Sequence, residues 1–495
     1  METKKSQKVK LSLCGVRGSI IAVLLFGCWS ASFASMQQRV NDLLKARNYD
    51  SGGIGIVVKD LSSDSIIVSI NPDTLLNPAS VAKLVTGAAA FEILGPNYHH
   101  FTRVYTDGEF NSDSGTVHGN LYIKGFGDPG FSAERLWLFV QHLRHRGIKT
   151  VKGNLILDDF YYDSVSVGPG FSEEDGSRAY QSVISALPVS FSAVGIHKRP
   201  GQEPGSPVHV DMFPKIDGVR INSSARTIEG SRGKIDVATS LSSGATQIAV
   251  RGSMAVDEKP RYTYRRVWQT WETFGGAFKA QCQESGLHIE GRTIRRKVPD
   301  SLAAKPAFYS FESEPMPVFI NHILKWSSNF VSEMLLKTMA ARQMGVPGTW
   351  PKGITVLSNW WEQKELPAKL HLGNGSGMGD VSRLSAAQVT ELLTYVHKQP
   401  YSHDYISALP SAGIDGTLRN RFNRSPLIGK VRAKTGTINS LKASSLAGFM
   451  FLEDKTYVFT IIFNNAGAGQ FDNWVMQEEI LQVIANTQPG VWRKR

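Results

Sequence analysis

The sequence predicts an α+β protein in which one antiparallel sheet, flanked by helices, is built from both ends of the chain around a large, mostly β insertion. Apolar alternation at residues 53–58 and 65–70 indicates two strands that pair with each other. Three more strands are expected near the end, at residues 430–437, 446–452 and 457–464. Because strands from both ends must share one sheet, the β-type runs within residues 101–298 form an insertion.

The first 34 residues have the pattern of a secretory signal peptide. Four lysines and Arg17 precede a short apolar run, and Ser32 and Ala34 then offer a small-residue cleavage site. The apolar run is too short for a membrane span. We therefore expect an exported protein from which residues 1–34 are removed.

A helix buried on all sides should follow the first two strands. Asn77 and Pro78 supply a cap and a proline at the first helical position, and Gly95 follows the last apolar residue. The interior of this segment is apolar almost all round, which is typical of a helix packed among other elements. With a short helix at residues 36–48, residues 35–100 make up the first part of the main domain.

Residues 101–305 are assigned to the insertion, which forms one or more β-rich domains. Its short β runs alternate with loops rich in Gly, Pro and Ser, and Ser132 caps a helix over residues 133–146. Residues 306–495 return to the main domain. Helices are expected there at residues 317–344, 386–397 and 471–487.

Composition narrows the classes of partner. The net charge of +12 favours an anionic wall or membrane surface as much as plain solubility, and basic patches with interleaved aromatic residues, typical of nucleic-acid binding, are absent from the sequence. The basic tail at residues 492–495 allows at most peripheral membrane contact. Only Cys282 remains after signal removal, so no internal disulfide is expected.

Three short strings carry the candidate chemistry. They are Ser80-Val81-Ala82-Lys83, Ser327-Ser328-Asn329 and Lys434-Thr435-Gly436. Each arises by chance in many chains, but their order S-x-x-K, S-x-N, K-T-G is the motif set of serine β-lactamases and penicillin-binding proteins. Their expected contexts are the start of a buried helix, a helical segment and a strand.

The spacing of the first string has a physical purpose. Ser80 is expected in the first helical turn, where free N–H groups and the helix dipole stabilise negative charge. Lys83 lies three residues later on the same face, so its amine can reach the hydroxyl of Ser80. A lysine acts as a base only when neutral, and burial beside a second cation, here Lys434, lowers its pKa.

These strings resemble the D-alanyl-D-alanine carboxypeptidase/endopeptidase family of low-molecular-mass penicillin-binding proteins, in the class C type with a large insertion between the first two motifs. Further strings are similar across most of the chain, including Gly127-Asp128-Pro129, Gly375-Ser376-Gly377 and Gly413-Ile414-Asp415-Gly416. The resemblance implies a serine β-lactamase/transpeptidase-like domain. It also implies peptidoglycan stem peptides and β-lactams as ligands, an enzyme of the periplasm or cell envelope, and no cofactor or metal.

The expected reaction passes through an acyl-serine. Ser80 is the nucleophile, Lys83 its base, Ser327 a proton relay and Asn329 a partner of Lys83. A second set of residues is expected to bind the substrate: Lys434, Thr435 and Gly436 hold the terminal carboxylate and the strand edge, and the N–H groups of Thr437 and Ser80 hold the oxyanion. Asp158, at the end of an insertion strand, is a further candidate for substrate binding, and a solvated loop acid is the alternative interpretation.

Several alternatives are weighed against this reading. Gly125-Phe126-Gly127-Asp128-Pro129-Gly130 matches a dinucleotide-binding pattern, but Pro129 removes a backbone donor where the phosphates would bind. The histidine pairs lack an H-E-x-x-H metal pattern. A β-lactamase is disfavoured by the missing E-x-x-L-N loop and the long insertion. A non-catalytic wall-binding protein stays open, as do oligomeric state and the choice between carboxypeptidase and endopeptidase action.

Overall fold

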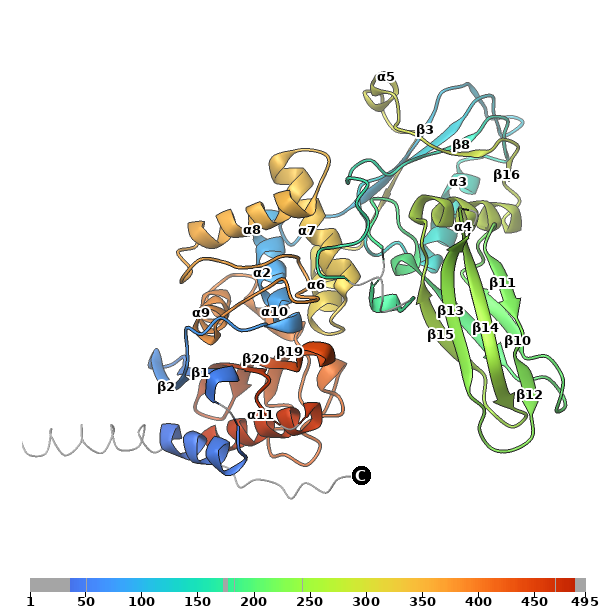
Figure 1. Cartoon of the computed structure of the whole chain (residues 1–495). Helices are drawn as coiled ribbons and strands as arrows, with labels where there is room; N and C mark the ends of the chain where they lie inside the picture. Colours follow the sequence, from blue (N-terminus) through green and yellow to red (C-terminus); the bar gives the residue numbers. More distant parts are fainter. Residues whose placement is uncertain are drawn as a thin grey trace, which may run out of the picture.

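The computed structural model describes residues 36–49, 51–171, 177–181, 183–242, 244–467 and 469–485. The expected signal peptide and the basic tail therefore lie outside the described residues. The described chain divides visibly into a unit that carries both chain ends and a lobe formed by the middle of the sequence (Figure 1).

The sheet built from both chain ends is confirmed. Its five strands are all antiparallel, in the order β19-β20-β21-β1-β2. The strands are β1 (Ile54–Asp60), β2 (Ser65–Ile70), β19 (Val431–Ile438), β20 (Ala443–Phe451) and β21 (Thr456–Asn464). The strand that carries the K-T-G string, β19, therefore lies at an edge of the sheet.

Helices cover both faces of this sheet, as the sequence predicted. On one face, Phe449 and Val458 pack with a group of helices; on the other, Ile56 and Ile461 pack with the last helix and the helix at residues 36–46 (Figure 1). The helices are α2 (Lys83–Ile93), α6 (Met316–Leu324), α7 (Asn329–Met344), α8 (Trp350–Gln363), α9 (Ala386–His397), α10 (Ser402–Ser407) and α11 (Gln470–Ile484). No helix in the described part of the chain is long and apolar enough to cross a bilayer.

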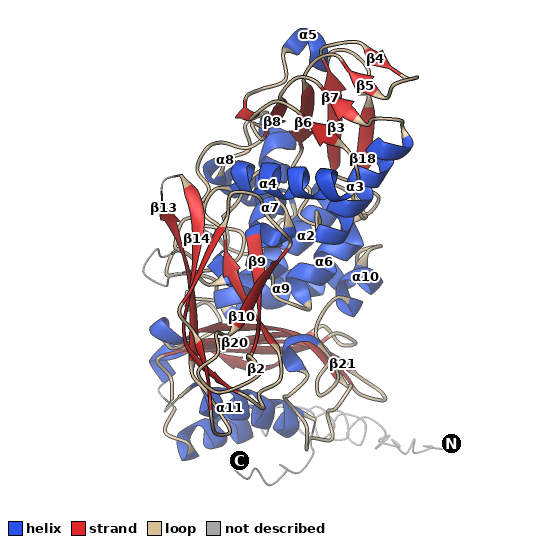
Figure 2. Ribbon diagram, turned by 90° about the vertical axis from the view of Figure 1, so that its right-hand side faces the viewer, coloured by secondary structure: helices blue, strands red, loops and turns tan. Residues whose placement is uncertain are grey.

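The middle of the chain forms four small sheets around a separate hydrophobic core (Figure 2). Its strands are β3 (Phe101–Thr106), β4 (Phe110–Asn111), β5 (Thr116–Val117), β6 (Leu121–Gly125), β7 (Thr150–Val151), β8 (Leu155–Asp158), β9 (Ala193–Arg199), β10 (His209–Phe213), β11 (Arg220–Ser223), β12 (Arg226–Ile228), β13 (Ile235–Ser242), β14 (Ala245–Ala255), β15 (Arg261–Arg266), β16 (His288–Ile289), β17 (Thr293–Arg295) and β18 (Tyr309–Glu312). Its helices are α3 (Ala133–His145), α4 (Thr270–Glu284) and α5 (Asp300–Ala303). Strand β18 pairs with β3 although it follows residue 305, so the lobe includes a returning strand that the expected boundary leaves out.

Two expected helices differ from the prediction. The segment 317–344 is not one helix, because Ser327 has a left-handed φ of 58° and Ser328 caps a new helix by accepting the N–H of Val331 at 3.2 Å. The buried helix begins with a 3₁₀ turn, η2 (Ala79–Ala82), before α2. Both differences fall on the motif strings.

Candidate active site

Ser80 lies in the 3₁₀ turn η2, immediately before the buried helix α2, and not within an α-helical turn. The preceding residue, Ala79, is buried and has a left-handed φ of 47°. Such a conformation costs a non-glycine residue on the order of 1–3 kcal/mol, and it persists only where the surrounding structure holds it. The backbone strain that sets the position of Ser80 is therefore maintained by neighbouring elements.

The side chain of Lys83 joins three of the chain segments that form the site. Its Nζ lies 2.8 Å from Ser80 Oγ, 2.7 Å from Asn329 Oδ1 and 2.7 Å from the carbonyl oxygen of Ser376. The last two atoms only accept hydrogen bonds, so each takes an N–H of the amine. The hydroxyl of Ser80 can donate as well as accept, which suits the lone pair of a neutral Lys83.

Burial lowers the pKa values of both lysines in the site. Complete burial lowers the pKa of Lys83 to about 7, against a smaller opposing effect from the carboxylate of Glu333. Burial also holds the pKa of Lys434 well below its usual range, and the positive charge of Lys83 lowers the pKa of Lys434 further. A base with a pKa near neutrality is half deprotonated at neutral pH, as general-base catalysis requires.

The S-x-N string forms the turn between α6 and α7. Asn329 starts α7 and directs Oδ1 to Lys83, while its Nδ2 donates to the carbonyl of Tyr180 at 3.0 Å. Ser327 Oγ accepts a hydrogen bond from Lys434 Nζ at 2.8 Å. The left-handed backbone of Ser327 thus places its hydroxyl beside the second lysine.

The K-T-G string lies on the edge strand β19 and contacts the nucleophile turn. Lys434 Nζ donates to Ser327 Oγ and to the carbonyl of Thr435 at 2.7 Å. Thr435 Oγ1 donates to Thr417 Oγ1 at 2.7 Å, and Thr437 Oγ1 accepts from Gln470 Nε2 at 2.8 Å. These contacts fix the side chains along the edge strand β19, whose first residues also pair with the segment 410–412.

Two glycines allow the backbone segments to approach the nucleophile turn. A Cβ on Gly436 would lie 2.7 Å from the carbonyl oxygen of Pro78 and 3.1 Å from the nitrogen of Ser80. Gly377 has a φ of 72°, and a Cβ there would lie 2.0 Å from the carbonyl oxygen of Ala79. Any side chain at either position would displace the turn that carries Ser80.

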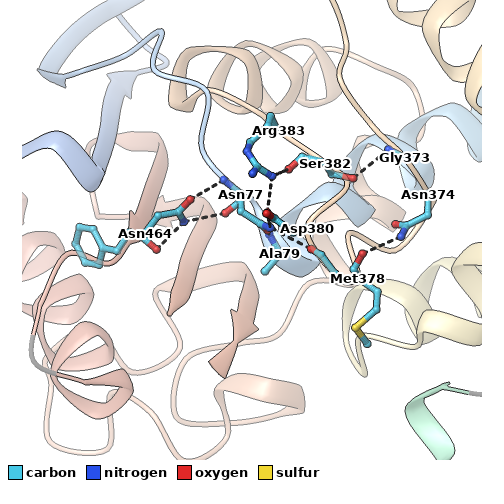
Figure 3. Close-up of polar contacts among 11 residues, drawn as sticks. Asn77, Ala79, Gly373, Asn374, Met378, Asp380, Ser382, Arg383 and Asn464 are labelled. Atoms are coloured by element: carbon cyan, nitrogen blue, oxygen red, sulfur yellow. Dashed lines mark hydrogen bonds and ion pairs between the residues drawn. The ribbon is translucent and has the colours of Figure 1, made fainter. Parts of the chain in front are cut away.

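Asn77 holds the strained turn from the other side (Figure 3). Its Oδ1 accepts the N–H of Ala79 at 2.9 Å, and its Nδ2 donates to the carbonyl of Gly379 and to Asp380 Oδ1, both at 3.0 Å. Its backbone N–H and carbonyl both pair with the side chain of Asn464, at 2.7 and 3.1 Å. Asn77 therefore ties the nucleophile turn to strand β21 and to the loop after Gly377.

Sequence reasoning did not assign the residues that complete the surroundings of Lys83. Ser376 and Gly375 donate their N–H groups to the buried carboxylate of Glu333, which orients the Ser376 carbonyl toward Lys83. The Gly375-Ser376-Gly377 string was a signal for this contact. Tyr180 contributes a backbone carbonyl, for which no residue-type signal exists.

Asp158 does not join this cluster. Its carboxylate is buried, accepts the N–H groups of Phe160 and Val298 at 3.1 and 2.9 Å, and pairs with Lys124 at 3.3 Å. All of these partners belong to the middle lobe. Its expected role in substrate binding stays a prediction that this geometry does not favour.

The cluster can therefore support nucleophilic acyl transfer: a hydroxyl beside one amine poised near neutrality, a second hydroxyl beside another buried amine, and an open strand edge. The segments in contact come from both ends of the chain and from its middle lobe.

Comparison with known sequences identifies a family. The model of the D-Ala-D-Ala carboxypeptidase 3 (S13) family matches residues 36–487. A D-alanyl-D-alanine carboxypeptidase of Actinomadura sp. (strain R39) is 28% identical over 452 residues, which cover 89% of this chain and 82% of the relative. The D-alanyl-D-alanine carboxypeptidase DacB of Haemophilus influenzae is 22% identical and covers 88% of this chain and 90% of its own.

Solved structures share the fold. Penicillin-binding protein 4 (dacB) of Haemophilus influenzae superposes with a TM-score of 0.77 at 21% identity, covering 90% of this chain and 98% of that one. A predatory peptidoglycan endopeptidase of Bdellovibrio bacteriovorus gives a TM-score of 0.51 at 16% identity, covering 89% and 94%.

Proposed function

The chain belongs to the D-Ala-D-Ala carboxypeptidase 3 (S13) family, and we propose that Ser80 is the nucleophile with which it cleaves peptidoglycan peptides. It is a penicillin-binding serine peptidase of the carboxypeptidase and endopeptidase class, as its relatives and structural neighbours support. The observation that carries the assignment of Ser80 is the 2.8 Å contact between its hydroxyl and a buried lysine whose other two contacts are carbonyl oxygens.

In the proposed acylation step, the proton of Ser80 Oγ passes to neutral Lys83 as the oxygen attacks the carbonyl of the penultimate D-alanine. The carbonyl oxygen becomes negative and is stabilised by the N–H groups of Ser80 and Thr437. The proton taken up by Lys83 then passes through Ser327 to the leaving amine as the C–N bond breaks, which leaves an acyl-serine and a neutral Lys83. Water attacks this ester in the second half of the reaction, with Lys83 again as the base.

Binding of the substrate places a negative charge beside Lys434. The terminal carboxylate is placed beside Lys434 and Thr435, while the peptide backbone extends the sheet at the edge strand β19. A carboxylate beside Lys434 raises the pKa of this lysine and keeps it positively charged. Lys83 is thereby kept neutral, since the neighbouring positive charge opposes its protonation.

The test is covalent labelling with fluorescent penicillin, whose carboxylate and strained amide imitate the peptide. Wild-type protein is expected to be labelled one to one, and Ser80→Ala to lose the label entirely, while Ser63→Ala, at an exposed serine in the turn between β1 and β2, keeps it. Labelling of Ser80→Ala at the wild-type rate would refute the assignment. Rapid release of the hydrolysed antibiotic would indicate a β-lactamase instead.

Carboxypeptidase and endopeptidase action share this acyl-enzyme and differ only in the amine that leaves. Digestion of monomeric pentapeptides and cross-linked dimers, followed by mass spectrometry of the products, separates the two. We further propose that the enzyme works in the periplasm or cell envelope, which the signal-peptide pattern of residues 1–34 supports, and that residues 101–305 act as an inserted unit beside the catalytic domain.

A further inference from the structure

Exposed aromatic side chains are concentrated on the middle lobe. Among the described residues, seven large aromatic side chains are exposed: Trp137, Tyr180, Phe213, Tyr262, Tyr264, Trp326 and Phe471. The first five of them belong to the lobe. Exposed apolar surface that is gathered in one region indicates a contact site for another molecule.

Two of these side chains lie next to each other on the three-stranded sheet β10-β9-β15. Tyr262 and Tyr264 are 54% and 61% exposed, and their rings stack at a centroid distance of 6.1 Å with an interplanar angle of 16°. The ring of His197, on the neighbouring strand, lies 4.7 Å from that of Tyr262. The opposite face of the same sheet is buried against the core through Val194 and Ile196.

The pairing of the three strands places Phe213 on the same face of the sheet as the two tyrosines. Tyr264 lies opposite Gly195, which in turn lies opposite Phe213, so the three share one face. Because Gly195 has no side chain, the two tyrosine rings lie over it: a Cβ there would lie 3.1 Å from Tyr264 Cε1 and 3.4 Å from Tyr262 Cδ1. The next row, from Tyr262 through His197 to Asp211, adds polar groups beside the rings.

Phe213 also borders a hollow of about 390 Å³ between the end of β10 and the helices α3 and α4. Trp137, 51% exposed, lines the same hollow, together with the polar side chains of Glu134 and Gln281. We call Tyr264, Tyr262, Phe213 and Trp137 the aromatic strip. Carboxylate, amide, ammonium and imidazole groups lie near these rings, from Glu134, Gln281, Lys215 and His197.

This chemistry fits a chain of sugar rings. A pyranose ring has an apolar C–H face and an edge of hydroxyl and amide groups, and it matches an aromatic ring that has hydrogen-bonding side chains next to it. A strip of exposed rings, rather than one closed pocket, suits a polymer. Resting on the proposed function, we propose that the aromatic strip binds the glycan strand whose stem peptides the enzyme cleaves.

The strip is connected to the catalytic site by a short path. Arg265, next to Tyr264, forms an antiparallel bridge with Arg178, and Tyr180, two residues further, accepts the hydrogen bond of Asn329. At about 3.8 Å per residue and about 5 Å across a bridge, this route covers roughly 16 Å to Tyr180. The contacts of Tyr180 with Asn329, of Asn329 with Lys83 and of Lys83 with Ser80 add roughly 13 Å, so Tyr264 lies within roughly 30 Å of Ser80. The straight line is shorter than this route.

The substrate is long enough to span much of that upper limit. A five-residue stem spans about 17 Å when extended, and the tyrosine side chain itself projects from the strand toward the ligand. A glycan strand held on the strip therefore presents its stems near Ser80. Binding of the strand raises the effective concentration of stems without changing the chemistry at the serine.

The test compares a polymeric with a short substrate. The double variant Tyr262→Ala/Tyr264→Ala is expected to bind insoluble peptidoglycan about tenfold more weakly in sedimentation, and to cleave it about tenfold more slowly. Its activity on a soluble pentapeptide and its labelling by fluorescent penicillin should equal those of the wild type. Trp137→Ala should show the same pattern more weakly.

Two control variants test whether a loss of peptidoglycan binding is due to the aromatic rings. Tyr262→Phe/Tyr264→Phe keeps the ring faces and should retain most of the binding, whereas Ile66→Ala removes an exposed apolar side chain on the far edge strand β2 and should change nothing. Unchanged sedimentation of the double alanine variant overturns the proposal, and so does a wild type that does not sediment with peptidoglycan. A change in oligomeric state by light scattering, with sedimentation unaltered, would instead identify a second copy of the chain as the occupant.

If the proposed function itself is wrong, the same experiments give a different result. In that case the wild type would not be labelled by penicillin or cleave the soluble pentapeptide, whatever the strip binds. An equal loss of activity on the soluble and the polymeric substrate in the alanine variant would also contradict glycan binding by the aromatic strip. The substitutions would then affect the reaction at Ser80 itself.

Discussion

Functional side chains are buried in the unit that contains Ser80, here called the catalytic unit, and exposed on the middle lobe. Lys83 and Lys434 are fully buried in the catalytic unit, whereas the rings of the aromatic strip are more than half exposed. Burial is what brings the pKa of Lys83 near neutrality, so the chemistry depends on side chains being enclosed. Exposure of the strip serves a different need, which is access for a long and rigid polymer.

The difference predicts where substitutions act. Changes at residues that contact the nucleophile turn or Lys83 should alter acylation of any substrate, including penicillin, because they move the nucleophile or its base. Changes on the lobe should leave acylation intact and affect stability or polymer binding. The three predictions below test this division, beginning with the largest expected effect.

Gly436→Ala should slow acylation by penicillin by about a hundredfold. The added methyl would lie 2.7 Å from the carbonyl oxygen of Pro78 and 3.1 Å from the nitrogen of Ser80, so β19 and the nucleophile turn must separate. A displacement of about 1 Å at a reacting group costs on the order of a hundredfold in rate. The measurement is the second-order rate constant of labelling with fluorescent penicillin.

A glycine on the lobe provides the control. Gly205→Ala introduces the same methyl at a left-handed φ of 91°, but no atom lies within 4 Å of it. This variant should lose about 1 kcal/mol of stability and acylate normally. Equal rate losses in the two glycine variants would mean that the separation between the two regions does not hold.

Much of this catalytic arrangement could be predicted from the sequence, because side-chain chemistry at fixed spacing has a recognisable pattern. The contact between Ser80 and Lys83, the partner role of Asn329 and the edge position of the K-T-G strand were expected, and the contacts are present. Helical periodicity continued through residue 327, however, and gave no sign that a left-handed serine interrupts the helix there.

Other features left no signal in the residue types. The carbonyl groups of Ser376 and Tyr180 contact Lys83 and Asn329 through the backbone, which every residue possesses. The aromatic strip combines residues of helix α3 and of strands β10 and β15, which are far apart in the sequence, and only the fold brings them together. Asp158, in contrast, ends a strand as expected, but its charge is satisfied within the lobe.

The pH dependence of acylation should follow Lys83. Burial lowers the pKa of this amine from its usual value to about 7, so the amine is increasingly protonated, and inactive as a base, as the pH falls below that point. The rate should fall about tenfold per pH unit there, to about thirtyfold below its plateau at pH 5.5. Stopped-flow labelling between pH 5 and 8 measures this limb, with circular dichroism to confirm that the fold persists. A constant rate from pH 5.5 to 8 would exclude Lys83 as the base.

Asp158→Asn should have the smallest effect on catalysis and is the sharpest test of the lobe. The carboxylate is 1% exposed and bonds to the N–H groups of Phe160 and Val298 and to Lys124, so its loss should cost about 1–3 kcal/mol of stability, seen as a lower melting temperature. The values of kcat and KM for a soluble pentapeptide should stay within about twofold of the wild type. Asp159→Asn is the matched control, because its carboxylate pairs with Arg295 at 2.7 Å in the same lobe. A KM that rises for Asp158→Asn but not for Asp159→Asn would show that Asp158 reaches the substrate after all, and that the lobe takes part in recognising the stem itself.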